Sequence, residues 1–397
     1  MTESTAAAVP ERQRRTVRVC DTLAAVPPQS WAPVAARAGL YSSHAWLTLV
    51  EQETEGLCRY LLVHDDAGLA GALPVYLTAD EPNPYYDPRS VFRAAVPGRG
   101  GRYCVAGSRS GYSNELLLAD RLGEAGRRAT AALLLDELAL LAREEEQQHA
   151  FLLYLNERGL RQVAGAAEGL APVLGYSGDA WLDVPGEGFG DYLAALTSSR
   201  RWTVRKELRG FAAEGLRTVR TDPRERLDLV VEFARRGNEK YGIVEDGAAL
   251  RTRFERQCAA FGEQGVLFEA RRGRTVLGVA LCYRWEDRLH LRMAGFDTAV
   301  PARAYAYFNV VIYESLRYCY ETGLRGVHLG TGSHDAKGGR GARIGPLASV
   351  ALPAAGADGA DPAAPAARAG VRRYWRQQSA RRPQLFDEEQ WRPWLGD

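Results

Sequence analysis

A glycine-rich segment near the end of the chain, TGSHDAKGGRGARIG, holds the residue types best suited to polar catalysis. Lys337 offers a compact cation that can donate to one developing oxyanion. His334 and Asp335 could take a proton from an attacking amine. Gly330 and Gly332 would let the main chain approach a ligand closely. Each of these residues also has a non-catalytic interpretation. The lysine could be an exposed loop residue and the histidine a solvated one, the aspartate could brace the loop, and the glycines could serve only the turn.

Lysine is rare in this chain, which makes its place in that segment informative. Among 51 basic residues, the lysines are Lys206, Lys240 and Lys337, and the rest are arginines. A sequence that uses arginine so widely has little reason to hold lysine where any cation would serve, because lysine is a point donor whose pKa burial can lower. Chance is the alternative at each position, and Lys337 is the lysine that we expect to act.

A strand–helix–strand unit is predicted around this segment. Residues 288–297 alternate apolar and polar side chains, as a strand with two unlike faces does. Residues 304–323 follow the 3.6-residue period of a helix, and Gly323 ends it. A right-handed crossover then brings the N-terminus of the helix beside the loop after Leu329. Such a juxtaposition suits an anion or a carbonyl oxygen.

Four further residues are candidate ligand contacts. Arg303 could bind a phosphate, and Tyr305 and Tyr307 open the helix. Tyr241, in NEKYGI, is predicted at a helix end where an acceptor would enter. Buried tyrosines with satisfied hydroxyls are the commoner case, so a structural role stays open for each tyrosine.

One long arginine-rich helix is predicted over residues 189–215. Arg201, Arg205 and Arg209 recur at i, i+4 and i+8, so that they repel rather than pair. We expect Arg201 and Arg205 to bind phosphate groups of a partner; a solvated helix face is the alternative. Its predicted apolar face consists of Phe189, Leu193, Leu196, Trp202, Leu208 and Phe211.

Length and composition limit the class of protein. A chain of 397 residues predicts two domains or a duplicated one. A net charge of +2 gives no general affinity for polyanions. No apolar run is long enough to span a membrane or to act as a signal peptide, so we expect a cytoplasmic protein without membrane insertion. The spacing of the cysteines and histidines fits no metal site, and we expect reduced thiols, no metal and no tightly bound cofactor.

The order of predicted elements indicates two copies of one α/β unit. We predict a disordered N-terminus at 1–15, an N-terminal domain at 16–186 and an active C-terminal domain at 187–353. A low-complexity linker follows at 354–370, and a basic, aromatic tail at 371–397 ends the chain. The tail could contact RNA, but a surface helix that docks its aromatic residues on the core is the favoured interpretation.

The second half resembles the GNAT acyltransferase superfamily, and its details are similar to the Fem-type branch. Members of that branch carry two GNAT-like domains and include aminoacyl-tRNA-dependent transferases. The resemblance is carried by LTSSRRWTVRKELRGFAAEGL, YESLRYCYETGLRGVHLGTG and SHDAKGGRG. It implies a tandem α/β fold, in which each GNAT-like domain is a mixed, mostly antiparallel sheet flanked by helices.

The resemblance also implies an N-acyltransferase that acts on the amine of a small molecule, a natural product or a peptidoglycan precursor. The donor would be an aminoacyl-tRNA or an acyl-CoA. CoA-dependent members wrap the pyrophosphate with spaced glycines after the fourth strand, but AGFDTAVPARAYAYF has no glycine after Gly295. This difference favours tRNA as the partner. The rival hypothesis is a non-catalytic GNAT-like pair that binds a phosphorylated ligand or RNA.

Overall fold

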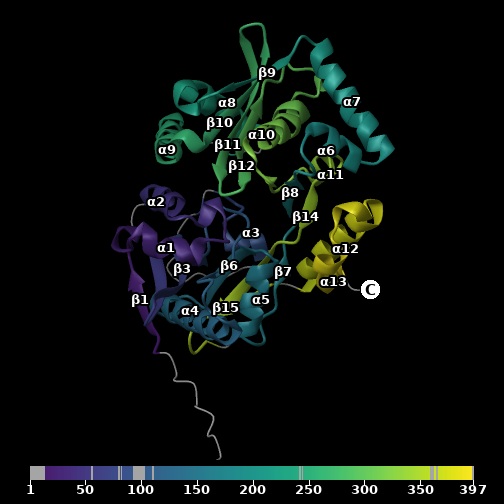
Figure 1. Cartoon of the computed structure of the whole chain (residues 1–397). Coiled ribbons are helices and arrows are strands. Elements are labelled where there is room, and N and C mark those ends of the chain that lie inside the picture. The colour runs from purple at the N-terminus through teal and green to yellow at the C-terminus, as the bar shows by residue number, and fades with distance from the viewer. Residues whose placement is uncertain are drawn as a thin grey trace, which may run out of the picture.

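The computed structural model describes residues 14–54, 57–78, 81, 83–92, 103–109, 111–240, 243, 245–357, 362–363 and 365–395. Two lobes, each built on one sheet, lie one above the other (Figure 1). The chain therefore has the predicted tandem α/β fold, with two mostly antiparallel sheets flanked by helices.

The N-terminal lobe contains the first sheet, in the order β1-β2-β3-β4-β6-β15-β7, with β5 paired to β3. Its strands are β1 (Thr16–Cys20), β2 (Cys58–Asp65), β3 (Gly68–Thr78), β4 (Tyr103–Ala106), β5 (Leu117–Leu118), β6 (His149–Leu155), β7 (Val173–Leu174) and β15 (Ala348–Pro353). Its helices are α1 (Pro28–Ala35), α2 (His44–Glu53), α3 (Pro88–Phe92), α4 (Glu124–Glu144) and α5 (Glu157–Ala166). The leucines of α4 recur at helical spacing and are buried against this sheet.

The C-terminal lobe contains the second sheet, in the order β14-β8-β13-β12-β11-β10-β9. Its strands are β8 (Asp179–Asp183), β9 (Arg217–Thr221), β10 (Gly265–Arg272), β11 (Thr275–Trp285), β12 (Arg288–Phe296), β13 (Gly326–Gly330) and β14 (Arg343–Gly345). Its helices are α6 (Phe189–Ala195), α7 (Ser198–Ala213), α8 (Leu227–Lys240), α9 (Gly247–Phe261), α10 (Glu314–Thr322), which continues the π-helix Phe308–Tyr313, and α11 (His334–Gly338).

The predicted strand–helix–strand unit is present as β12, the helix that ends in α10, and β13. Gly323 has a left-handed φ of 73° and closes α10 as the sequence predicts. By contrast, the long helix predicted over 189–215 is two helices, α6 and α7, because Leu196 between them is extended.

The sheets exchange strands, so that sheet membership does not follow the predicted boundaries at 186 and 353. β8 falls within the predicted N-terminal domain but lies inside the second sheet between β13 and β14. β15, predicted to end the second half, lies inside the first sheet between β6 and β7. The strands thus pass from the first sheet to the second between β7 and β8 and return to the first between β14 and β15.

The N-terminal lobe fills the gap that its two parallel strands leave. β4 and β6 pair over only three positions, 104–106 with 150–152. Beyond this point Asn114 forms a parallel bridge with Leu155, and its Nδ2 donates to the carbonyl oxygen of Leu153 at 2.9 Å. The space between the diverging strands is therefore occupied by protein.

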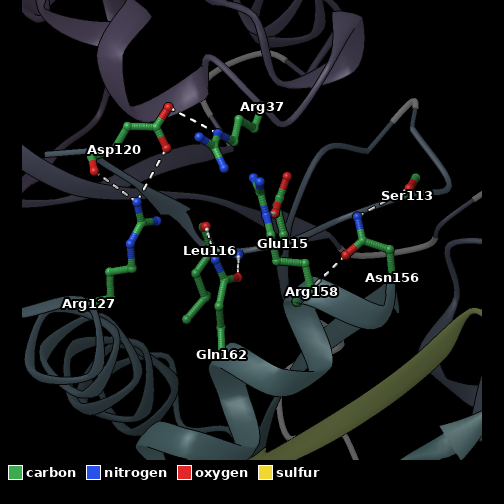
Figure 2. A network of polar contacts seen from close by, with 10 residues as sticks. Arg37, Ser113, Glu115, Leu116, Asp120, Arg127, Asn156, Arg158 and Gln162 are labelled. Atoms are coloured by element: carbon green, nitrogen blue, oxygen red, sulfur yellow. Dashed lines mark hydrogen bonds and ion pairs between the residues drawn. The ribbon is translucent and has the colours of Figure 1, made fainter. Parts of the chain in front are cut away.

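Helix α5 holds this inserted segment from outside (Figure 2). The Gln162 amide bonds both main-chain groups of Leu116, at 2.9 and 3.1 Å. Arg158 pairs with the buried carboxylate of Glu115. These contacts fix the segment as part of the core, so this split between β4 and β6 is filled by protein.

The predicted linker and tail form two helices, α12 (Pro365–Arg381) and α13 (Glu388–Leu395). Trp375 and Trp391 are 0% and 1% exposed and pack on the core of the C-terminal lobe. Their indole N–H groups donate to the carbonyl oxygens of Gly175 and Ile344, both at 2.7 Å. The docked-helix interpretation of the tail is therefore confirmed, and the helix begins inside the predicted linker. In the described part of the chain, no helix is both long and apolar enough to cross a bilayer.

Candidate functional site

A cavity of about 900 Å³ lies between the two lobes. One wall comes from the N-terminal lobe, with Glu53, Asn83, Pro84, Tyr86, Arg109 and Tyr112. The other walls come from α8, α9, β12, the connection after β12 and α11. Its polar and charged lining residues are Glu53, Asn83, Tyr86, Arg109, Tyr112, Asn238, Glu245, Arg253, Arg292, Asp297, Tyr305, Tyr307, Thr331, Ser333 and Lys337. Both halves of the chain therefore contribute to one candidate site.

The cavity forms where β12 and β13 diverge. These strands pair in parallel over three positions, 288–290 with 326–328. β12 also carries a bulge: Leu291 and Met293 pair with consecutive residues of β11, which leaves Arg292 outside the ladder. The alternation predicted for this strand is therefore interrupted, and Met293 packs with the core on the opposite side from Leu291.

Lys337 is buried in α11, and the segment predicted as a loop is a short helix at this point. Only 3% of the residue is exposed. Its Nζ donates to the carbonyl oxygens of Leu329, Gly330 and Thr331 at 2.8, 3.0 and 2.8 Å. Burial lowers the pKa of the amine from 10.5 to about 8. The ammonium thus lies on the cavity wall as a fixed cation whose three N–H groups are engaged.

His334 and Asp335 lie on the same helix but do not line the cavity. The Nε2 of His334 accepts from the amide of Gly178 at 3.0 Å, its ring packs against Trp375, and burial lowers its pKa. Asp335 forms an ion pair with Arg382 at 2.8 Å. Both side chains therefore connect α11 to its neighbours rather than to Lys337.

The rim of the cavity contains the start of the helix that ends in α10. Tyr305 and Tyr307 line the cavity, and Tyr305 has a left-handed φ of 52°. The guanidinium of Arg303 is exposed and pairs with Glu214 at 2.6 Å. Across the cavity Gly330 and Gly332 have φ values of 67° and 76°, which favour glycine. The helix start and the loop after Leu329 therefore share one cavity, as the crossover predicts.

Helix α7 presents an arginine face to solvent. Within the described chain, Arg201, Arg205 and Arg209 have no acidic partner. Trp202, predicted on the apolar face, is instead 59% exposed, with Lys206 Nζ 5.4 Å from its ring centroid. The helix reaches the cavity rim at its other end, where Gly210 packs against Tyr305.

Glu207 departs from this face and points inward. It is 2% exposed and pairs with Arg340, and the hydroxyl of Tyr313 donates to the same carboxylate. These bonds fix α7 to the segment after α11. Tyr241, the remaining predicted contact, lies outside the described residues.

Sequence reasoning missed the wall from the N-terminal lobe. Tyr86 and Tyr112 stack there with ring centroids 5.3 Å apart, and no sequence motif singles out either residue. It also missed Arg253, which bridges Glu53 of α2 and Glu245 at 3.1 and 2.5 Å. No local signal marks these residues, because their partners lie far away in the sequence.

A buried polar cluster joins the lobes beside the cavity without lining it. His328 Nε2 lies 2.7 Å from the Asp179 carboxylate, and the ring of His290 lies 5.2 Å from that of His328. Burial holds the pKa of His290 well below its usual value. Burial raises the pKa of Asp179, but His328 and the hydrogen bonds from Trp181 and Ser113 together more than offset this, so the pKa lies below its usual value. Tyr41 of the N-terminal lobe covers both histidines, so the cluster serves the interface.

Comparisons with known proteins agree with this arrangement. Residues 198–338, from α7 to α11, match the family model described as an acetyltransferase (GNAT) domain. Comparison with curated protein sequences finds no match.

Solved structures share the architecture of both lobes. A conserved protein of unknown function from Bacteroides thetaiotaomicron is similar with a TM-score of 0.54 and 11% identity, over 85% of this chain and 100% of that one. L-PGS from Bacillus licheniformis is similar with a TM-score of 0.50 and 9% identity, over 82% of this chain and 91% of that one. At these identities the likeness shows the fold alone.

Proposed function

We propose that this chain is an N-acyltransferase for an amine acceptor, because residues 198–338 match an acetyltransferase (GNAT) domain. The acceptor is a small molecule, a natural product or a peptidoglycan precursor. The observation that carries this proposal is the buried ammonium of Lys337 on the wall of the interdomain cavity, where β12 and β13 diverge.

The reaction joins the amine nitrogen to the carbonyl carbon of an ester or thioester through a tetrahedral oxyanion. The C–O or C–S bond to the donor then breaks, the leaving group takes a proton, and the amine releases one to water in the cavity. A fixed cation beside the oxyanion is typically worth a few kcal/mol. Lys337 supplies this charge, and it contacts the oxyanion directly when one of its three main-chain bonds is exchanged.

Aminoacyl-tRNA is the donor that the surface near the cavity favours. The arginines of α7 are of one sign and have no acidic partner in the described chain, which suits a row of phosphates. The same helix reaches the cavity rim at Gly210. At the connection after β12, where spaced glycines would wrap a pyrophosphate, Arg303 is paired with Glu214 and Tyr305 takes the left-handed position.

Mass spectrometry of candidate amines incubated with the protein, charged tRNAs and acyl-CoAs tests both the reaction and the donor. We expect an aminoacylated product that requires charged tRNA. Thermal denaturation with CoA is the control, because a ligand bound only by the folded state must stabilise it. A saturable rise in Tm at millimolar CoA, with product formed from acyl-CoA, would reverse the choice of donor.

A non-catalytic binding protein for RNA or a phosphorylated ligand is the second candidate. It is favoured by one observation: the main chain occupies all three N–H groups of Lys337. In that case Lys337→Ala would leave ligand binding intact, whereas Arg201→Glu would abolish it. Product formation by the wild-type protein but not by Lys337→Ala would exclude this candidate.

A further inference from the structure

We propose that Arg292 binds an anionic group, a carboxylate or a phosphate, of the amine acceptor. This inference rests on the proposed acyl transfer and adds a substrate class to it. The bulge in β12 makes Arg292 the extra residue between Leu291 and Met293. Bulges re-aim side chains next to active sites, and this one directs a guanidinium to the cavity wall.

The other arginines on the cavity wall are already neutralised. Arg109 pairs with the buried carboxylate of Glu81 at 2.5 Å. Arg253 lies between two carboxylates, Glu53 and Glu245. The remaining cation, Lys337, is satisfied by main-chain carbonyl oxygens.

Arg292 has no such partner among the residues that the structure describes. Its Nε donates to the neutral amide oxygen of Gln257 at 3.1 Å. Its guanidinium lies 5.4 and 5.8 Å from the ring centroids of Trp46 and Phe254. Ring faces and an amide hold the guanidinium in place but leave its charge uncompensated. Because arginine matches carboxylate and phosphate geometry with two parallel bonds, the missing partner is an anion that enters the cavity.

The position of Arg292 assigns this anion to the acceptor rather than to the donor. Trp46 and Phe254 belong to the core between the second sheet and the N-terminal lobe. The inner face of α7, with Val204 and Phe211, belongs to the core on the other side of that sheet. A donor held by the α7 arginines therefore approaches from one side, and an anion on Arg292 is held on the other.

Thermal denaturation of the full chain with matched probes tests the inference without requiring activity. The minimal anions are inorganic phosphate and acetate. The matched amines are O-phosphoethanolamine against ethanolamine and L-lysine against L-lysinamide, which separate phosphate from carboxylate recognition. We expect a saturable rise in Tm with the anionic member of at least one pair and none with its partner. Arg292→Gln should weaken that binding at least tenfold, and Arg292→Lys should weaken it less.

Arg274→Gln is the matched control, because it removes the same charge from the exposed turn between β10 and β11. It should bind the probes as the wild type does, and circular dichroism verifies the fold of each variant. Equal shifts in Arg292→Gln and wild type, or no saturable shift with any anionic probe, would overturn the inference. If the Tm shift depends on Arg292 but the protein transfers no acyl group, the proposed function is wrong and the anion site at Arg292 remains supported.

Discussion

Replacing Lys337 by methionine should make the stability of the protein respond differently to pH. The folded protein holds the pKa of this amine at about 8, against 10.5 when it is exposed. Between these values the unfolded chain binds more protons than the folded one, so the free energy of unfolding rises with pH. A pKa difference of one unit corresponds to 1.36 kcal/mol, so the shift from 10.5 to about 8 means that the charged amine lowers the free energy of unfolding at pH 7 by about 3 kcal/mol relative to the neutral amine.

Methionine removes this cost but also removes three hydrogen bonds, worth about 1 kcal/mol each. The two proteins should therefore have similar free energies of unfolding at pH 7, and the wild type should be more stable by about 2 kcal/mol at pH 9.5. Urea denaturation at both pH values measures the difference. Lys206→Met, at an exposed position of α7, is the control and should show no such change.

The same titration has a kinetic consequence. If the protonated amine stabilises the oxyanion, kcat should fall as pH rises through about 8. Lys337→Met should lower kcat by a factor of about 10²–10³. A difference in stability between wild type and Lys337→Met that does not change from pH 7 to 9.5 would refute the burial argument. A rate that rises above pH 8 would instead make the neutral amine the active form.

Three other outcomes follow from the geometry. Replacing both Arg201 and Arg205 by glutamine should weaken tRNA binding, with a loss that shrinks as salt rises; a loss independent of salt in a filter-binding assay would show that they act by packing. Trp375→Ala should lower the free energy of unfolding by about 3–5 kcal/mol because its ring is buried, whereas Trp202→Ala should leave it within about 0.5 kcal/mol; equal losses in urea titrations would contradict this. Glu207→Gln should lower the free energy of unfolding by about 3 kcal/mol, because it leaves the buried guanidinium of Arg340 without its counter-charge. An unchanged free energy of unfolding would show that water reaches this ion pair.

Local patterns were sufficient where one segment decides its own structure. The helix that ends at Gly323 and the strand before it were predictable because apolar periodicity and a left-handed glycine act over a few residues. The two repeated units and the GNAT resemblance follow from the order of such elements along the chain. The unusual lysine was visible as well, because its rarity is a property of composition.

Only the tertiary structure decided what those residues face. Trp46 and Arg292 meet across the lobes, and β8 and β15 exchange sheets; no periodicity records pairings over such distances. The bulge that aims Arg292 at the cavity interrupts an alternation that the sequence shows as regular. The burial that lowers the pKa of Lys337 likewise comes from packing around α11. The types of the reactive groups are thus set by the chain, but their charge, exposure and partners arise only when both lobes enclose one cavity, because solvent exclusion depends on every surrounding segment at once.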